Sequence, residues 1–142
     1  MTSTQEDACV VAGAKLIVVL GHANNAVMRM AVEAFLTGRR VADATRCAHL
    51  DPIVAEVQKT IDPRRIERWE SLPPPEQQAC LDDLYRAYVL RVIDRILHES
   101  VVLRGLVEVG QLKAVGGMYD VRSGRIDFFE SSPATPGSAG PA

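Results

Sequence analysis

The sequence has few cysteines and no long hydrophobic run. Its 142 residues include three widely spaced cysteines, Cys9, Cys47 and Cys80, and no Cys-x-x-Cys pair. An odd number of cysteines argues against a disulfide framework. The longest apolar run extends from Leu16 to Leu20, which is far short of the roughly 20 residues that a membrane span requires. We therefore expect neither a disulfide-stabilised scaffold nor a membrane protein.

The sequence also lacks an excess of one charge. Its formal net charge is -2, with acidic and basic residues interleaved, so no strong attraction to nucleic acid or anionic lipid is expected. The N-terminal MTSTQEDA has no basic region leading into an apolar one. This argues against a signal peptide and makes a cytoplasmic location the default expectation.

Hydrophobic periodicity predicts alternating helices and strands. The continuous apolar run at 16–20, bounded by Gly13 and Gly21, is typical of a parallel strand that is covered on both faces. Apolar residues at helical spacing, with proline and glycine as boundary signals, predict helices at 5–12, 27–37, 52–61, 76–100 and 102–109. Two further strands are predicted at 112–121 and 125–129, antiparallel to each other about a turn at Ser123-Gly124.

These elements predict one three-layer α/β domain over residues 1–130. Its sheet is short and mostly parallel, with about three strands, the last one antiparallel, and it is flanked by helices. Residues 131–142, SSPATPGSAGPA, have nothing to bury and are expected to be disordered.

A short polar loop containing Gly21, His22, Asn24 and Asn25 joins the first predicted strand to the next helix. Asparagine is a preferred helix cap, so one of the two asparagines is expected to cap that helix. A loop at the carboxyl end of a parallel strand also offers backbone N–H groups to anions, so an anion site is a second interpretation. His22 is interpreted either as a metal-ligand position or as a histidine that hydrogen-bonds at the end of the strand.

Several segments, in this order and at this spacing, resemble the β-class carbonic anhydrases, which are zinc enzymes that interconvert carbon dioxide and bicarbonate. The segments that carry the resemblance are 6–15 (EDACVVAGAK), 16–22 (LIVVLGH), 91–96 (RVIDRI), 100–104 (SVVLR), 110–120 (GQLKAVGGMYD) and 123–126 (SGRI). The resemblance implies a strand at 16–20 followed by a zinc-ligand histidine, His22, and a closing hairpin formed by the last two strands.

The resemblance also implies that most of the zinc site is missing. The family pattern is Gly-His-x-x-Cys-Gly, whereas here Asn25 and Ala26 stand where the cysteine and the second glycine would be. The family's Cys-x-Asp-Ser-Arg motif, which carries the other cysteine ligand and an Asp–Arg pair, belongs to a portion upstream of the matching segments. We therefore expect His22 to be a vestigial ligand.

The loss of two thiolates is severe for zinc chemistry. Catalytic zinc generally takes three protein ligands and leaves a fourth position for water, whose pKa it lowers to about 7. A neutral carboxamide such as that of Asn25 is a weak donor compared with a thiolate. We therefore expect no bound zinc and no hydration of carbon dioxide by this chain alone.

Other polar groups have simpler interpretations. Cys47 and His49 are spaced too tightly for a usual zinc pair, so helix-entry packing is expected. Asp82-Asp83 diverge on a helix and do not form an acid–base pair. Gly116-Gly117 marks close backbone packing in a strand.

The absence of the family's first two strands would place the strand at 16–20 at the edge of the sheet, with an uncovered apolar face. Edges of this kind pair with something, so a homo- or hetero-oligomer that forms through the Leu16-to-Leu20 edge is expected. Three functional hypotheses remain. The chain is a catalytically inactive binding or assembly subunit, a zinc-dependent carbonate dehydratase completed by a partner chain, or a fragment without a selected role.

Overall fold

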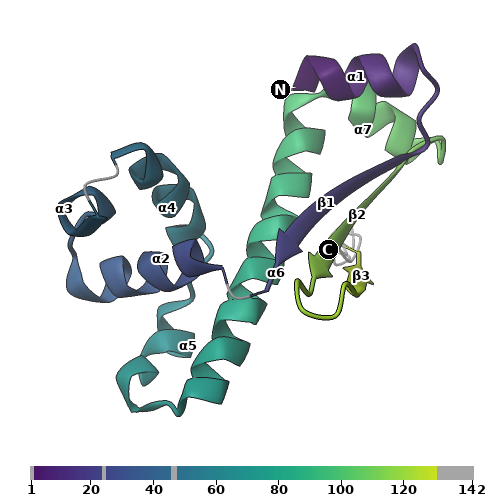
Figure 1. Cartoon of the computed structure of the whole chain (residues 1–142). Helices are drawn as coiled ribbons and strands as arrows, with labels where there is room; N and C mark the ends of the chain where they lie inside the picture. The colour runs from purple at the N-terminus through teal and green to yellow at the C-terminus, as the bar shows by residue number, and fades with distance from the viewer. Residues whose placement is uncertain (1, 24, 46–47, 131–142) are drawn as a thin grey trace, which may run out of the picture.

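The computed structural model describes residues 2–23, 25–45 and 48–130. In chain order the elements are α1 (Thr2–Val10), β1 (Leu16–His22), α2 (Ala26–Thr37), α3 (Val41–Thr45), η1 (Ala48–Leu50), α4 (Asp51–Gln58), α5 (Pro63–Ile66), η2 (Trp69–Ser71), α6 (Pro74–Glu99), α7 (Val101–Glu108), β2 (Lys113–Tyr119) and β3 (Ile126–Phe129). Figure 1 shows α2, α3, α4 and α5 grouped on one side of the long helix α6, and the strands on the other. The predictions made for Asn24, Cys47 and the tail at 131–142 lie outside the described residues.

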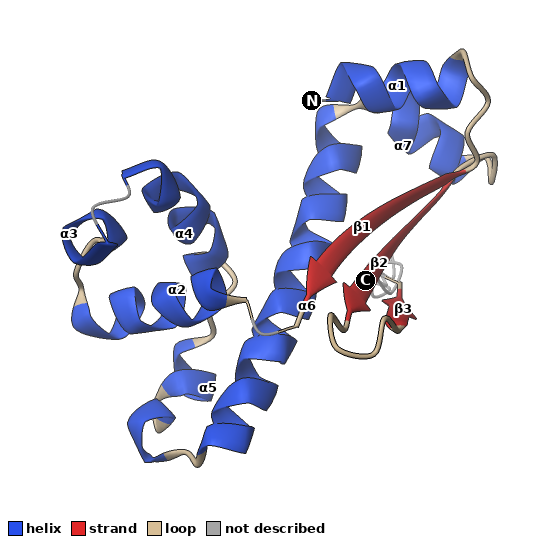
Figure 2. Cartoon of the chain, viewed as in Figure 1, coloured by secondary structure: helices blue, strands red, loops and turns tan. Residues whose placement is uncertain are grey.

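The three strands form one mixed sheet in the order β1-β2-β3. β1 pairs with β2 in parallel, from Leu16 opposite Lys113 to His22 opposite Tyr119. β3 pairs with β2 antiparallel, and Figure 2 shows the short hairpin that joins them. The predicted α/β class, the three strands and the antiparallel last strand are confirmed. β1 lies at the edge of the sheet, as expected.

Helix α6 covers one face of this sheet. A Cβ atom on Gly21 would lie 3.1 Å from Val89 Cγ2 and 3.2 Å from Tyr85 Cε2 of α6, so the alternate residues Ile17, Val19 and Gly21 face the helix. On the opposite face, Leu16, Val18 and Leu20 are 52%, 39% and 50% exposed.

The expectation that the strand at 16–20 is covered on both faces, drawn from the apolar run alone, is therefore wrong, whereas the uncovered apolar face expected from the absence of the family's first two strands is present in the described residues. A run of apolar residues reports hydrophobicity on both faces, but it does not report whether this chain supplies a cover for each of them. Of the three layers expected, the described part of the chain supplies two, the sheet and the helices packed on it.

Two apolar clusters meet along α6. The larger one joins α2, α4, Trp69 and the N-terminal half of α6, with Val32 and Val57 fully buried. The smaller one joins α1 to α7 through Cys9, Leu103 and Leu112. The prediction that Cys9 is a buried small hydrophobe is confirmed, whereas Cys80 is only partly buried. None of the helices in the described part of the chain is both long and apolar enough to cross a bilayer.

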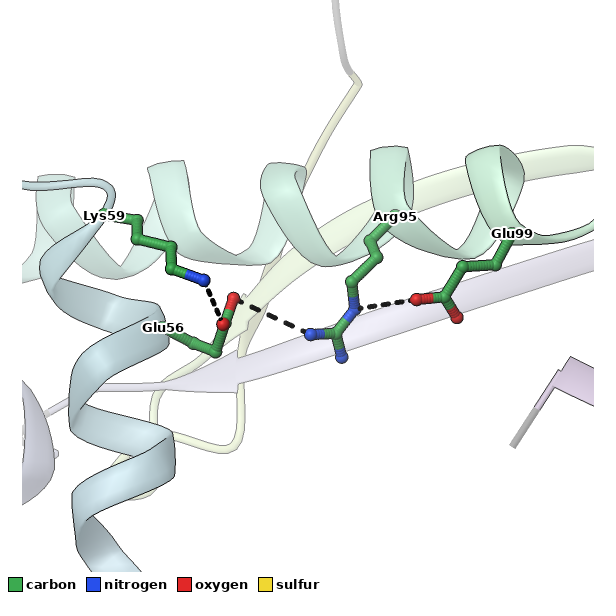
Figure 3. A network of polar contacts seen from close by, with 4 residues as sticks. All are labelled: Glu56, Lys59, Arg95 and Glu99. Carbon is green, nitrogen blue, oxygen red and sulfur yellow. Dashed lines mark hydrogen bonds and ion pairs between the residues drawn. The ribbon is translucent and has the colours of Figure 1, made fainter.

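An ion-pair network ties α4 to α6, as Figure 3 shows. Glu56 on α4 accepts a hydrogen bond from Lys59 and lies 3.8 Å from Arg95 on α6, measured from Oε2 to Nη1. Arg95 also contacts Glu99, with 3.7 Å between Nε and Oε1. The Lys59 hydrogen bond, assisted by the charges of Lys59, Arg95 and Arg91, lowers the pKa of Glu56 below its ordinary value of 4.5.

Replacing Glu56 by glutamine tests this network. Because its pKa is lowered in the folded state, Glu56 stabilises the fold above pH 4.5 and loses that contribution as the pH falls through its folded-state pKa. The expected loss of stability in Glu56→Gln is small, since Glu56 is only partly buried and its partners Lys59 and Arg95 are exposed to solvent. This difference in the free energy of unfolding between Glu56→Gln and the wild type should be present near neutral pH and absent in strong acid. Urea denaturation across this range is the measurement, with exposed Glu108→Gln as the control. A difference that persists in strong acid would contradict this account.

Candidate functional site

The candidate site lies at the carboxyl ends of β1 and β2, where the chain turns into α2. His22 is in register with Tyr119, and the Ala23 N–H donates to the Tyr119 carbonyl at 3.0 Å. This bond extends the β1–β2 pairing by one residue and fixes where the loop begins. Just before the loop, Gly21 approaches Tyr85 and Val89 near the middle of α6.

Asn25 caps helix α2, which confirms one of the two interpretations of the loop. Its side-chain Oδ1 accepts from the Val27 N–H at 2.8 Å, and its backbone is extended, with φ -73° and ψ 115°. Its Nδ2 donates to the Tyr85 hydroxyl on α6 at 3.1 Å. Both the oxygen and the nitrogen of the Asn25 carboxamide are therefore hydrogen-bonded, and the side chain links the start of α2 to α6.

His22 is exposed at the end of β1. Its ring meets the Tyr85 ring edge-on, with centroids 5.8 Å apart. One interpretation of His22 expected its side chain to form a hydrogen bond at the end of the strand. Among the described residues, the side chain makes this aromatic contact instead. The position of His22 as a vestigial ligand stays a prediction.

Gly21 serves packing in this loop. A Cβ atom at this position would lie 2.8 Å from Met118 Sδ, in addition to its close approach to α6. Two backbone N–H groups at the start of α2 already donate to Asn25. The Val27 N–H donates to its side chain, and the Met28 N–H donates to its carbonyl at 3.2 Å. The anion site at Gly21, His22, Asn24 and Asn25 stays a prediction, with fewer free N–H groups than the sequence suggested.

The donor atoms near His22 do not fit a zinc ion. Within the described residues, no three His, Cys, Asp or Glu side chains gather closely enough to hold a metal. Cys9 packs between α1 and α7. Cys80 lies on α6 with Sγ 3.9 Å from the Arg65 carbonyl, where burial raises the pKa of its thiol. One imidazole beside a hydrogen-bonded carboxamide falls short of the three-ligand set that catalytic zinc requires.

Two simpler expectations about polar and glycine pairs are confirmed. Asp82 accepts a hydrogen bond from Gln78, whereas Asp83 pairs with Arg65 at 3.4 Å, so the two carboxylates diverge. The Gly116-Gly117 pair marks close packing, since a Cβ atom on Gly116 would lie 2.5 Å from the Phe129 ring.

Sequence reasoning missed a polar hollow of about 430 Å³ beside the loop, between α6 and the β2–β3 turn. Arg86 and Asp127 form an ion pair at 2.7 Å on its wall. Asp120 lies at the turn, where hydrogen bonds from the Arg122 N–H and the Ser123 hydroxyl lower its carboxyl pKa. Arg86 and Asp127 are 41 positions apart, and no local pattern connects them.

The sequence profile of the carbonic anhydrase family matches residues 1–126, and the segments that carry the resemblance fall in α1 and the loop after it, in the sheet and its connecting turns, and along α6 and α7. The chain belongs to the β-class carbonic anhydrase family. No curated protein matches the chain.

Solved β-carbonic anhydrases share the fold. CafA of Aspergillus fumigatus is 22% identical, with a TM-score of 0.66 over 92% of this chain and 56% of that one. One of the two tetrameric enzymes from Sordaria macrospora is 19% identical, with a TM-score of 0.68 over 94% and 61%. The β-carbonic anhydrase CcaA is 14% identical, with a TM-score of 0.60 over 93% and 58%. The chain therefore spans about three-fifths of the length of these relatives.

Replacing Asn25 by alanine should cost about 1 kcal/mol of stability, since it removes the cap of α2. Asn25→Asp keeps the capping oxygen and should retain most of the stability. Tyr85→Phe removes only the second hydrogen bond and separates the two contributions. Urea denaturation of the three variants is the measurement, and equal stabilities for Asn25→Ala and the wild type would contradict the capping role.

Proposed function

We propose that this carbonic anhydrase homologue is a catalytically inactive member of its family that acts as a binding or assembly subunit. The proposal rests on the observation that the Asn25 side chain is hydrogen-bonded within the fold at both its oxygen and its nitrogen. The side chain at the expected cysteine position caps α2 and binds Tyr85, so it contributes to the fold in place of metal binding.

The chemistry of hydration supports this proposal. The reaction needs hydroxide at neutral pH, which zinc supplies when three ligands hold it and a water fills the fourth position. His22 and Asn25 together offer one imidazole and one engaged carboxamide. A site of this composition gives no means of retaining the ion against competing chelators.

One observation favours a second candidate, a zinc-dependent carbonate dehydratase completed by a partner chain. The His22 side chain is exposed at the end of β1, where ligands from another chain can reach it. Completion in trans requires that chain to bring two thiolates and an Asp–Arg pair. Activity would then appear only in a mixture of the two chains.

Elemental analysis and a hydratase assay on the purified chain test the first candidate against the second. We expect zinc far below one ion per chain and hydration no faster than in buffer alone, because the donor set is incomplete. The His22→Ala variant is the matched control, since any zinc that survives this change is bound elsewhere. Stoichiometric zinc that His22→Ala abolishes, together with turnover by the wild type, would refute the inactive assignment.

The assembly role rests on the free edge of β1. The Lys15 carbonyl accepts from the Lys113 N–H and the Ala23 N–H donates to Tyr119, each at 3.0 Å. Odd-numbered residues of the strand therefore direct their backbone groups to β2, and Leu16, Val18 and Leu20 direct theirs outward.

The sequence of this strand lacks two features that commonly protect an edge. The run from Leu16 to Leu20 contains neither a charged residue nor a proline to discourage pairing. The Sordaria macrospora relatives are described as tetrameric. We therefore propose a homo- or hetero-oligomer that pairs along this edge.

Replacing Val18 by proline should weaken this pairing. Proline removes one outward N–H while leaving the bonds from β1 to β2 in place. We expect the dissociation constant, measured by sedimentation, to rise at least about tenfold. Val18→Ala keeps the N–H and is the control, and circular dichroism checks that both variants fold. A stable wild-type monomer at micromolar concentration, with no partner chain that Val18→Pro releases, would contradict edge pairing.

A further inference from the structure

The face of the sheet turned away from α6 is apolar across all three strands. We call it the open face and define it by six exposed side chains: Leu16, Val18 and Leu20 of β1, Tyr119 of β2, and Ile126 and Phe128 of β3. Their exposed fractions run from 36% for Tyr119 to 59% for Phe128. Figure 2 shows the strands on one side of α6, and the close approach of Gly21 to Tyr85 and Val89 places the helix on the other face of the sheet.

Gly117 makes the open face continuous. A Cβ atom on Gly117 would lie 2.8 Å from Leu20 Cδ2, 3.1 Å from Ile126 Cγ2 and 3.4 Å from Phe128 Cδ1. Side chains of both outer strands thus lean together over the backbone of β2. The result is one patch instead of two separate rows.

The size of the patch is that of an interface. With residue surfaces of roughly 150–250 Å², the exposed fractions amount to roughly 600 Å² per chain, at the upper end of what monomers expose in one patch. Two such patches facing each other bury roughly 1,200 Å², the lower limit for a specific, stable interface.

We propose that the open face packs against the open face of a second copy of this chain. This inference rests on the assembly role proposed above and adds a contact that edge pairing does not use. The six side chains carry no charge, so a second copy meets no repulsion. Lys113, at one end of the patch, is neutralised by Glu130 at 2.5 Å.

The shape of the patch also suits its own copy. Two-fold symmetry makes such an interface self-complementary. An axis along β2 sets β3 of one copy over β1 of the other. Phe128 and Leu20 both pair with Gly117, so the exposed Phe128 then lies opposite Leu20 of the other copy, as in two sheets packed face to face about 10 Å apart.

Phe128→Lys tests this contact, because β3 lies on the far side of β2 from the free edge. We expect its dissociation constant for self-association, measured by sedimentation equilibrium, to be raised at least about tenfold, since a lysine pair would be buried without partners. The melting temperature of the wild type, but not of Phe128→Lys, should rise with protein concentration. Val121→Lys is the matched control, because Val121 is 53% exposed and lies outside the patch.

The outcomes separate this inference from edge pairing. Loss of association in Phe128→Lys, with Val121→Lys unchanged and both variants folded by circular dichroism, supports the face-to-face contact. Association of Phe128→Lys equal to the wild type overturns it, and edge pairing still stands if Val18→Pro dissociates. A monomeric wild type overturns the face-to-face contact. Association into ever larger species, without a dimer or another oligomer of defined size, also overturns it. An oligomer that forms only with a different protein overturns it too.

Discussion

Helix α6 packs closely on the β1–β2 pair, and the site and the rest of the fold depend on this contact. The approach is close because Gly21 has no side chain, so Tyr85, Val89 and Met118 fill the space that a Cβ atom would need. Through Tyr85 the helix also reaches Asn25 and sets the start of α2. Through Arg95 it reaches Glu56 and holds α4. The described elements are thus positioned by one helix that covers one face of one small sheet.

The predictions from sequence that succeeded are those that depend on local patterns. Strand and helix positions depend on local periodicity, and β1, α2, α6 and the closing hairpin all lie where the patterns predicted them. The asparagine cap is also local, because Asn25 binds an amide two residues away. The short helices α3 and α5 have too few residues to produce a periodic signal.

What failed or was missed depends on contacts between distant segments. A run such as LIVVL is equally hydrophobic whether a second layer covers it or not, so burial on both faces could not be distinguished from burial on one. The pair of Arg86 with Asp127 and that of Asn25 with Tyr85 join segments 41 and 60 positions apart. Their existence depends on how α6 lies across the sheet, which neither residue type nor spacing reveals.

The face-to-face contact bears on the two functional candidates. His22 follows Leu20 at the carboxyl end of β1, but its ring packs against Tyr85 of α6 instead of lying on the open face. A second copy packed there would bring another His22 and another Asn25, but no thiolate from the described residues, because Cys9 and Cys80 lie on α1 and α6. Self-association therefore adds surface complementarity without completing a zinc-ligand set. An interface between copies agrees with the proposed scaffold role, because none of the cysteines that the structure describes would reach His22 through it.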